Sequence, residues 1–328
     1  MPEITSKNSR QWSRMGSRAV LGQAILLLAE TKKNLMILSA DLGGSSGLSR
    51  FKNAYPDNFL NVGISEQNMI GVAAGLAKEG YVVFATSFAP FISMRSGEQV
   101  RMNMGYMELN IKAVAIGSGV AMSFLGNSHY GLEDASIMRS IPNLAVVSPA
   151  DCGEIVKTVF AAAEYEGPMY IRLTGETNNP VVYNEDYNFE IGKSITLRKG
   201  KEISIFANGT MVYESLEAAK ILDSDGLSAT VVNMHTIKPL DTSVIDNAVA
   251  SSKLIVSIEE HSVIGGLGGS IAEYKTGLKN APPQLIIGLP DKFGKVGDHN
   301  YLLEKYGLKA KQIAGKIMKQ YQLQIKPP

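Results

Sequence analysis

From residue 16 onward, apolar positions alternate between the spacing of a helix and the unbroken runs of a buried strand. Residues 17–29 place Ala, Val, Ile and Leu along one face of a helix, and residues 35–39 form a short apolar run. A second helix opens at Glu66, and a strand follows it over residues 82–85. This alternation predicts a doubly wound α/β sheet with helices on both faces. The other strands expected in this part of the chain are residues 111–116 and 169–173.

The C-terminal part repeats the same alternation and predicts a second α/β domain. Residues 174–200 are rich in Asn, Glu, Tyr and Gly and lack helical periodicity, which is typical of a linker. We therefore expect a flexible N-terminus over residues 1–15, a first domain over 16–173 and a second over 201–328. The elements expected in the second domain are strands over 203–207, 229–233 and 254–258, and helices over 209–222 and 242–250.

Charge and composition narrow the class of protein. The 32 basic and 31 acidic residues leave a net charge of +1 without a basic block, so neither nucleic acid nor a membrane surface is expected as a partner. No apolar run approaches the length of a membrane span. The single cysteine, Cys152, cannot form an internal disulfide and is interpreted as a buried or incidental thiol. Together these features favour a cytoplasmic protein whose ligand is a small metabolite.

The segment from residue 61 to residue 101 carries the most informative chemistry. Glu66 follows an apolar run, and Phe88 and Phe91 stand at the mouth of the helix after the next strand. An acid beside two aromatic rings suits a flat, protonatable heterocycle, because the carboxyl exchanges a proton with a ring nitrogen while the aromatic faces stack. Taken singly, however, Glu66 fits a solvated helix start and the two phenylalanines fit a core.

The order of motifs resembles the pyrimidine-binding domain of transketolases. The likeness lies in VGISEQNMIGVAAGLA around Glu66, in TSFAPF, and in IMRSIPNLAVVSPAD, and it continues through IVSIEEHSVIGGLGGSIAE in the second domain. It implies thiamine diphosphate chemistry, with Glu66 as the acid that protonates the aminopyrimidine. Phe88 and Phe91 would pack around the ring, and Asp41 would lie near the cofactor at a subunit interface.

The same resemblance implies a set of substrate contacts. His129 falls where transketolases carry a substrate-binding histidine, and imidazole can exchange protons with sugar oxygens. A surface histidine is the alternative for such a residue in a loop. Arg18 and Ser45 match positions that contact the phosphate of the acceptor. The implied reaction transfers a two-carbon ketol unit from a ketose donor to an aldehyde or ketone acceptor.

Two positions depart from the transketolase pattern. Leu125 stands where the family has an Asp that contacts a substrate hydroxyl, and Gly175 stands where it commonly has an Arg that clamps the acceptor's phosphate. Leucine accepts no hydrogen bond, and glycine cannot replace the bidentate contact of a guanidinium. We therefore expect non-standard sugar substrates and weak or no activity with ribose 5-phosphate, although Arg18 and Ser45 argue against excluding a phosphate altogether.

The chain also lacks a motif that thiamine diphosphate chemistry needs. No Gly-Asp-Gly occurs in the sequence, and the family uses that motif to hold a divalent metal on the diphosphate. The resemblance therefore implies the C-terminal section of a split transketolase. A partner subunit would carry the diphosphate-binding domain with its Mg²⁺, and two copies of each subunit would form a heterotetramer.

Three alternatives stay open. The beta subunit of a 2-oxo acid dehydrogenase's decarboxylating component shares the domain order and also needs a partner. A non-catalytic interaction subunit would explain the lost contacts at Leu125 and Gly175, although the retained Glu66, Asp41 and His129 speak against it. A synthase that joins pyruvate to glyceraldehyde phosphate is similar in its C-terminal domain but is normally one long polypeptide.

Three features of the second domain are interpreted as structural or surface features. The Gly-rich run at residues 265–269 opens a helix but has neither a dinucleotide fingerprint nor a P-loop, so it predicts a tight turn from strand to helix. Glu259, Glu260 and His261 are consecutive and would point apart, which favours a loop over a metal site. His235 and His299 are interpreted as structural or surface residues.

Overall fold

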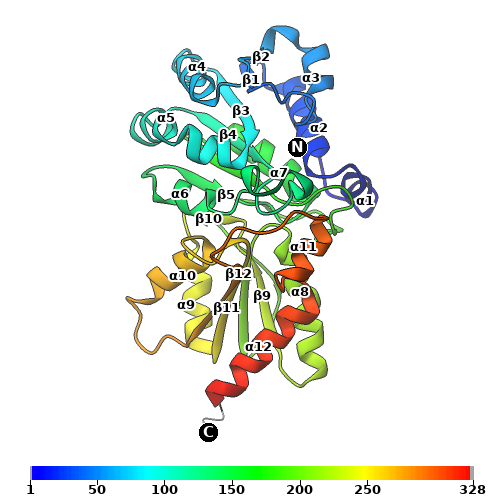
Figure 1. Cartoon of the computed structure of the whole chain (residues 1–328), viewed down its shortest axis with the longest axis vertical. Helices are drawn as coiled ribbons and strands as arrows, with labels where there is room; N and C mark the ends of the chain where they lie inside the picture. The colour runs from blue at the N-terminus through cyan, green and yellow to red at the C-terminus, as the bar shows by residue number, and fades with distance from the viewer. Residues whose placement is uncertain (1, 326–328) are drawn as a thin grey trace.

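The computed structural model describes residues 2–325 and contains two α/β sheets, one above the other in Figure 1. The first sheet has the strand order β10-β5-β6-β4-β3-β1-β2, and the second has the order β12-β11-β8-β9-β7. The strands are β1 (Leu35–Ser39), β2 (Phe59–Asn61), β3 (Val82–Phe88), β4 (Ile111–Ile116), β5 (Ala145–Val147), β6 (Met169–Leu173), β7 (Ile195–Arg198), β8 (Ile203–Ala207), β9 (Ala229–Asn233), β10 (Thr236–Lys238), β11 (Leu254–Ser262) and β12 (Gln284–Leu289).

Helices and single helical turns connect the strands. The α-helices are α1 (Ser6–Met15), α2 (Ser17–Thr31), α3 (Ser49–Ala54), α4 (Glu66–Lys78), α5 (Gly97–Gln99), α6 (Asp134–Ser140), α7 (Cys152–Glu164), α8 (Met211–Ser224), α9 (Thr242–Ser251), α10 (Leu267–Lys275), α11 (His299–Lys305) and α12 (Ala310–Ile325). The remaining turns are 3-10 helices η1 (Pro56–Asn58) and η4 (Ser123–Ser128), and π-helical segments η2 (Phe91–Arg95) and η3 (Val100–Tyr106).

The first sheet is buried on both faces, which confirms the doubly wound α/β class. Alternate residues of each strand point to opposite faces, so Ile37 and Phe84 pack with α2 and α7, while Leu38 and Val83 pack with α4 and α6. Every pairing in the sheet is parallel except that of β10 with β5. The carboxyl ends of β1, β3 and β4 therefore meet at one edge, where such sheets bind ligands.

The second sheet is also covered on both faces. Helices α8 and α12 pack on one face and α9 and α10 on the other. Its strands are parallel apart from β7, which pairs antiparallel with β9. Strand β10 follows β9 in the chain but joins the first sheet, and one cluster of buried apolar residues runs from α2 and α7 to β8 and α8. The two sheets therefore share a continuous core.

Residues 1–15 were expected to form a flexible N-terminus, whereas the structure contains a helix in this segment. Residues 6–15 form α1, which begins with a capping box: Thr5 Oγ1 accepts from the backbone N–H of Asn8, and Asn8 Oδ1 accepts from that of Thr5. Trp12 is buried at 4% exposure, and Ser9 Oγ donates to the carbonyl of Tyr183 over 2.8 Å. The helix therefore packs on the connecting segment between the domains.

Three further expectations about local structure were tested. Strand β7 lies inside the segment expected to be a linker. The loop expected at Glu259, Glu260 and His261 was wrong, because these residues continue β11 and are fully buried. They are tolerated there because each has internal partners; both oxygens of Glu259, for example, accept N–H bonds from the first turn of α10. The tight turn expected before α10 is confirmed.

Candidate active site

Glu66 begins α4, where the chain turns from β2 into the helix. Its side chain is 1% exposed, so the alternative of a solvated residue at a helix start is wrong. The location favours an acid, because the first turn of a helix presents free N–H groups and the positive end of the helix dipole. A buried carboxylate must have hydrogen-bond partners, and two donors from other elements supply them.

The two donors to Glu66 were not singled out from the sequence. Ser87 Oγ donates to Oε1 over 3.0 Å from the end of β3, and Arg95 Nη1 donates to Oε2 over 2.8 Å from η2. The Arg95 guanidinium also lies over the Phe91 ring, 4.2 Å from its centroid. The spacing of four residues between Phe91 and Arg95 is the only sequence signal for this contact. Together the two donors fix the carboxylate in one orientation.

Three aromatic rings lie together beside this carboxylate. The Phe88 and Phe91 centroids are 5.8 Å apart, and the His129 ring lies 5.3 Å from each, all in edge-to-face contact. Phe88 is buried, whereas Phe91 and His129 are partly exposed. Partial burial and the charge of Arg95 lower the pKa of His129 below its usual 6.5, so the imidazole is neutral at pH 7. Neutral His129 can accept or donate a hydrogen bond.

Asp41 lies in the loop that follows β1, next to the end of β2. It adopts a positive φ of 60° and exchanges two hydrogen bonds of 2.9 Å with Asn61, one through its carboxylate and one through its backbone N–H. Asp41 is exposed and lines a hollow of about 290 Å³ with Lys52 and Phe59. The structure therefore holds Asp41 at the carboxyl edge of the first sheet, on an open face.

Arg18 and Ser45 are brought together although they are far apart in sequence. Both line a cavity of about 260 Å³ whose other walls include Gly16, Glu176 and Thr177. The loop that carries Ser45 continues to Gly47, whose backbone lies against α2 so closely that a Cβ there would come 2.4 Å from the carbonyl of Arg18. This close packing places the cavity between the start of α2 and the end of β6.

The two departures from the transketolase pattern occupy different surroundings. Leu125 is 50% exposed in η4, four residues before His129. Gly175 is buried, has a φ of 78°, and its carbonyl accepts a hydrogen bond of 2.9 Å from Ser17 Oγ. Arg172 cannot act in place of an arginine at 175, because it is fully buried and donates twice to Asp134 over 3.0 Å.

The geometry places the expected residues in three groups. Glu66, Phe88, Phe91 and His129 form one cluster with Arg95, while Asp41 lies in a neighbouring hollow. Arg18 and Ser45 line their own cavity together with Glu176. The buried acid and the partly open rings fit a flat heterocycle with a protonatable nitrogen, since the acid offers an acceptor and the rings offer stacking area.

Some classes of site find no support in the described part of the chain. Within residues 2–325, no group of three or more His, Cys, Asp or Glu side chains is placed to hold a metal ion. No helix in that range is long and apolar enough to cross a membrane. Cys152 is buried, and burial raises the pKa of its thiol to about 12, so it is an inert thiol rather than a nucleophile.

The fold and the cluster define a two-domain α/β protein with a buried carboxylate beside partly open aromatic rings. Residues 13–179 match the transketolase pyrimidine binding domain, and residues 192–313 match the transketolase C-terminal domain. The chain belongs to the transketolase family.

Its relatives include proteins of split transketolases. It is 41% identical over 306 residues to a Methanocaldococcus jannaschii protein described as a putative transketolase C-terminal section. The match covers 93% of this chain and 96% of that protein. A 6-deoxy-6-sulfo-D-fructose transketolase subunit of Clostridium sp. is 39% identical over 88% of this chain and 89% of its own length. A split gene transketolase, solved as an inactive β4 tetramer, superposes with a TM-score of 0.85 at 39% identity, over 94% of this chain and 99% of that one.

Proposed function

We propose that this chain is the C-terminal subunit of a thiamine diphosphate-dependent transketolase with non-standard substrates. The observation that carries the proposal is Glu66, a buried acid with two fixed donors beside the rings of Phe88, Phe91 and His129. Family membership makes thiamine diphosphate the heterocycle that this cluster would take. When bound, the cofactor supplies an electron sink for a carbanion next to a former carbonyl carbon.

Each side chain of the cluster has a role that its surroundings allow. Glu66 would hold and exchange a proton at the ring nitrogen, while Ser87 and Arg95 keep its carboxylate in place. Phe88 and Phe91 would pack against the ring. His129 would pass protons to and from substrate oxygens, because its lowered pKa leaves the imidazole neutral and able to accept.

A partner subunit is part of the proposal. Without a Gly-Asp-Gly motif in this chain, the diphosphate and its Mg²⁺ are assigned to a second polypeptide that resembles the N-terminal section of a transketolase. We propose a heterotetramer with two copies of each subunit. The β4 tetramer of the similar split transketolase was inactive, which supports assigning activity to the complex rather than to this chain alone.

The first experiment is a pull-down of the tagged chain from its native cells, with mass spectrometry of the proteins that co-purify. A stoichiometric partner with Gly-Asp-Gly and a downstream Asn would support the proposal and provide the complex for assay. If the chain is recovered alone and binds no thiamine diphosphate with magnesium, the proposal fails in favour of a non-catalytic subunit.

The second experiment changes Glu66 in the assembled enzyme. Glu66→Gln keeps the shape of the side chain but removes the proton exchange, and we expect turnover to fall by about 10²–10⁴-fold. Glu79→Gln is the matched control, because Glu79 is an exposed acid at the other end of α4. Size-exclusion chromatography verifies that both variants still assemble. Near-normal turnover of Glu66→Gln would refute the assigned role.

Substrate screening separates the transketolase from its alternatives. Because Leu125 and Gly175 replace two polar contacts, we expect weak or no turnover with ribose 5-phosphate as acceptor and turnover with other ketose and aldehyde or ketone pairs. Normal turnover with ribose 5-phosphate would refute the substrate prediction. Turnover of pyruvate with a lipoyl acceptor, and none with ketoses, would favour the 2-oxo acid dehydrogenase component instead.

A further inference from the structure

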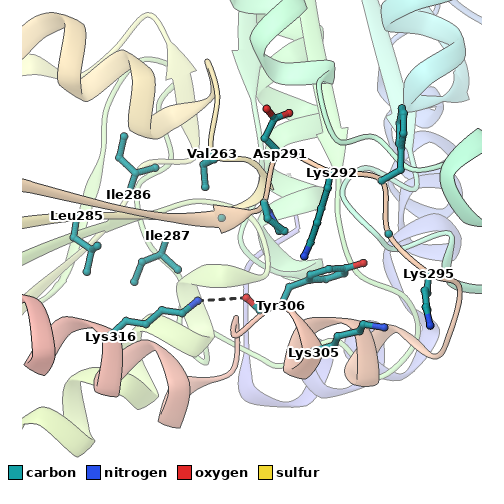
Figure 2. Close-up of a pocket in the computed structure, with 14 residues that line it drawn as sticks. Val263, Leu285, Ile286, Ile287, Asp291, Lys292, Lys295, Lys305, Tyr306 and Lys316 are labelled. Carbon is teal, nitrogen blue, oxygen red and sulfur yellow. Dashed lines mark hydrogen bonds between the residues drawn. The ribbon is translucent and has the colours of Figure 1, made fainter.

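The second domain contains a cavity of about 730 Å³, which is larger than either hollow beside the candidate active site. Figure 2 shows it bounded by β12, by the end of α11, by α12 and by the loop at residues 290–295. β12 is the edge strand of its sheet, and the loop follows its carboxyl end, where open α/β sheets receive ligands. None of the residues expected in the active site lines this cavity.

The lining combines an apolar floor with a surplus of positive charge. Val263, Leu285 and Ile287 are among the floor residues. The charged residues of the lining are four lysines and a single acid, namely Lys292, Lys295, Lys305, Lys316 and Asp291. In Figure 2 the ammonium groups of Lys292 and Lys316 extend toward Tyr306 from two different elements. Two ammonium groups from separate walls are suited to a ligand with more than one negative charge.

Lys316 is held at this wall by its own contacts. Its Nζ donates to the carbonyls of Gly307, over 2.9 Å, and of Tyr306, over 3.3 Å, at the end of α11. These two bonds leave one of its three N–H donors for a ligand. Partial burial lowers the pKa of Lys316 from its usual 10.5, and an anion in the cavity would offset that cost.

Tyr306 offers a second feature that a ligand would explain. Its hydroxyl is buried and has no hydrogen-bond partner within residues 2–325. The hydroxyl lies against Gly294 of the lining loop, where a Cβ would come within 2.0 Å of it. A buried donor without a partner is costly, and because the loop of Gly294 covers this hydroxyl, a ligand would have to shift that loop to offer it an acceptor group.

The loop that lines the cavity also contacts the turn that carries His129. Gly294 exchanges two hydrogen bonds with the Asn127 side chain, donating its N–H over 2.9 Å and accepting over 2.8 Å. In the same loop, Val296 lies against Gly126, where a Cβ would come within 2.6 Å of its side chain. A ligand that moves residues 291–295 would therefore move the His129 turn as well.

We propose that this cavity is an effector site for a phosphorylated small molecule of nucleotide size, and that its occupancy reaches the His129 turn through Gly294 and Asn127. The volume lies within the range of small-molecule sites, the lysines supply the phosphate contacts, and the apolar floor takes an uncharged ring. Binding at this cavity requires no partner subunit. The functional meaning of an effect on His129 rests on the role that the proposed function gives to that residue.

The binding test uses the isolated chain and ADP as the probe, measured by calorimetry at low ionic strength, with adenosine as the uncharged control. We expect ADP to bind and adenosine to bind at least about tenfold more weakly, because the lysine contacts are charge-assisted. Lys292→Met and Lys316→Met should each weaken ADP by about five- to tenfold. Lys319→Met is the matched control, since Lys319 is an exposed lysine of α12 outside the lining.

The outcomes separate the cavity from other sites. Lys292 lies on an exposed loop, so its substitution should leave folding intact even where that of Lys316 does not. No ADP binding at millimolar concentration, or binding unaffected by Lys292→Met, would overturn the site. Loss of binding in Arg18→Met instead would move it to the cavity lined by Ser45.

The link to the active site has its own readout. In NMR spectra of the chain labelled at its four histidines, ADP should shift the ring signals of His129, and Asn127→Ala should abolish that shift while ADP still binds. Binding that leaves the His129 signals unchanged would overturn the link. Because both measurements use this chain alone, they can succeed or fail independently of transketolase activity.

Discussion

Glu260 joins the two domains, and its removal should lower stability by several kcal/mol, which is about 3–5 for a buried ion pair. Its side chain is fully buried in β11. Oε1 accepts from the backbone N–H of Val120 in the first domain over 2.9 Å and lies 3.0 Å from His299 Nε2, while Oε2 accepts from Thr210 Oγ1 over 2.7 Å. Glu260→Ala would remove the acceptor of all three donors at once.

The magnitude follows from what the substitution leaves behind. Removing one member of a buried ion pair typically costs about 3–5 kcal/mol, because the remaining charge and donors stay buried without partners. Glu260→Gln should cost less, about 1–2 kcal/mol, since its carbonyl still accepts and the Thr210 hydroxyl can reverse to accept from the amide. We therefore expect a clear gap between the two variants.

The pH dependence gives a second check on the same pair. Burial alone would raise the pKa of Glu260, but His299 lowers it below its usual 4.5. Burial alone would lower the pKa of His299, but Glu260 raises it above 6.5. The glutamate contribution is thus lost as pH falls below about 4.5, and the histidine contribution is lost as pH rises above about 6.5 and through the raised pKa. The wild type should exceed Glu260→Gln in stability most between these values.

Urea unfolding at several pH values provides the measurement. Fluorescence of Trp12, the single tryptophan, reports on the first domain, and circular dichroism reports on both domains. Because a two-domain chain need not unfold in one step, coincidence of the two transitions must be verified before free energies are compared. A cost below about 1 kcal/mol for Glu260→Ala, or a pH-independent difference for Glu260→Gln, would refute the reasoning.

Three further changes test other parts of the structure. Gly175→Arg should destabilise the chain by at least about 1–3 kcal/mol, because φ is 78° and a Cβ would lie 2.2 Å from Asn179; unchanged urea midpoints would contradict this. Trp12→Ala should cost about 3–5 kcal/mol if α1 is packed as described, and almost nothing if it is not; urea unfolding is followed by circular dichroism alone, because the variant has no tryptophan. Arg95→Met should raise the pKa of His129 in an NMR titration, since the charge of Arg95 contributes to lowering it, and an unchanged value would exclude that contribution.

The strands were predictable because their signal is local. Runs such as residues 35–39 and 203–207 are apolar throughout and are buried on both faces in the structure, as parallel strands require. The motif around Glu66 also placed the acid at the start of a helix and Phe91 at the start of the next helical segment, as in the structure, whereas Phe88 is the last residue of β3. What a short sequence window encodes, in apolar pattern or in a motif, was therefore recovered.

The missed features depend on partners that are distant in sequence. Glu260 looked like a loop residue because its charge is normally exposed, and its burial is explained by partners that are distant in sequence, namely Val120, Thr210 and His299. Strand β10 is three residues long and gains its place from pairing with β5 of the other domain, a contact that periodicity cannot reveal. Residues 1–15 did carry a local signal, the Thr5 to Asn8 capping box, but their polar composition obscured it.

The structure around Gly175, where we propose that the acceptor binds, differs from a site that has merely lost one side chain. Its carbonyl accepts from Ser17, and the space toward its missing Cβ is filled by Asn179, so the backbone is packed for glycine. The next residue, Glu176, places a carboxylate in the cavity of Arg18 and Ser45 and accepts a hydrogen bond from Ser123 Oγ. A carboxylate there opposes part of the attraction of Arg18 for an anion. Position 175 is thus packed for glycine, and its neighbour Glu176 weakens the cavity's attraction for an anion, which supports the proposal of a substrate other than the usual pentose phosphate.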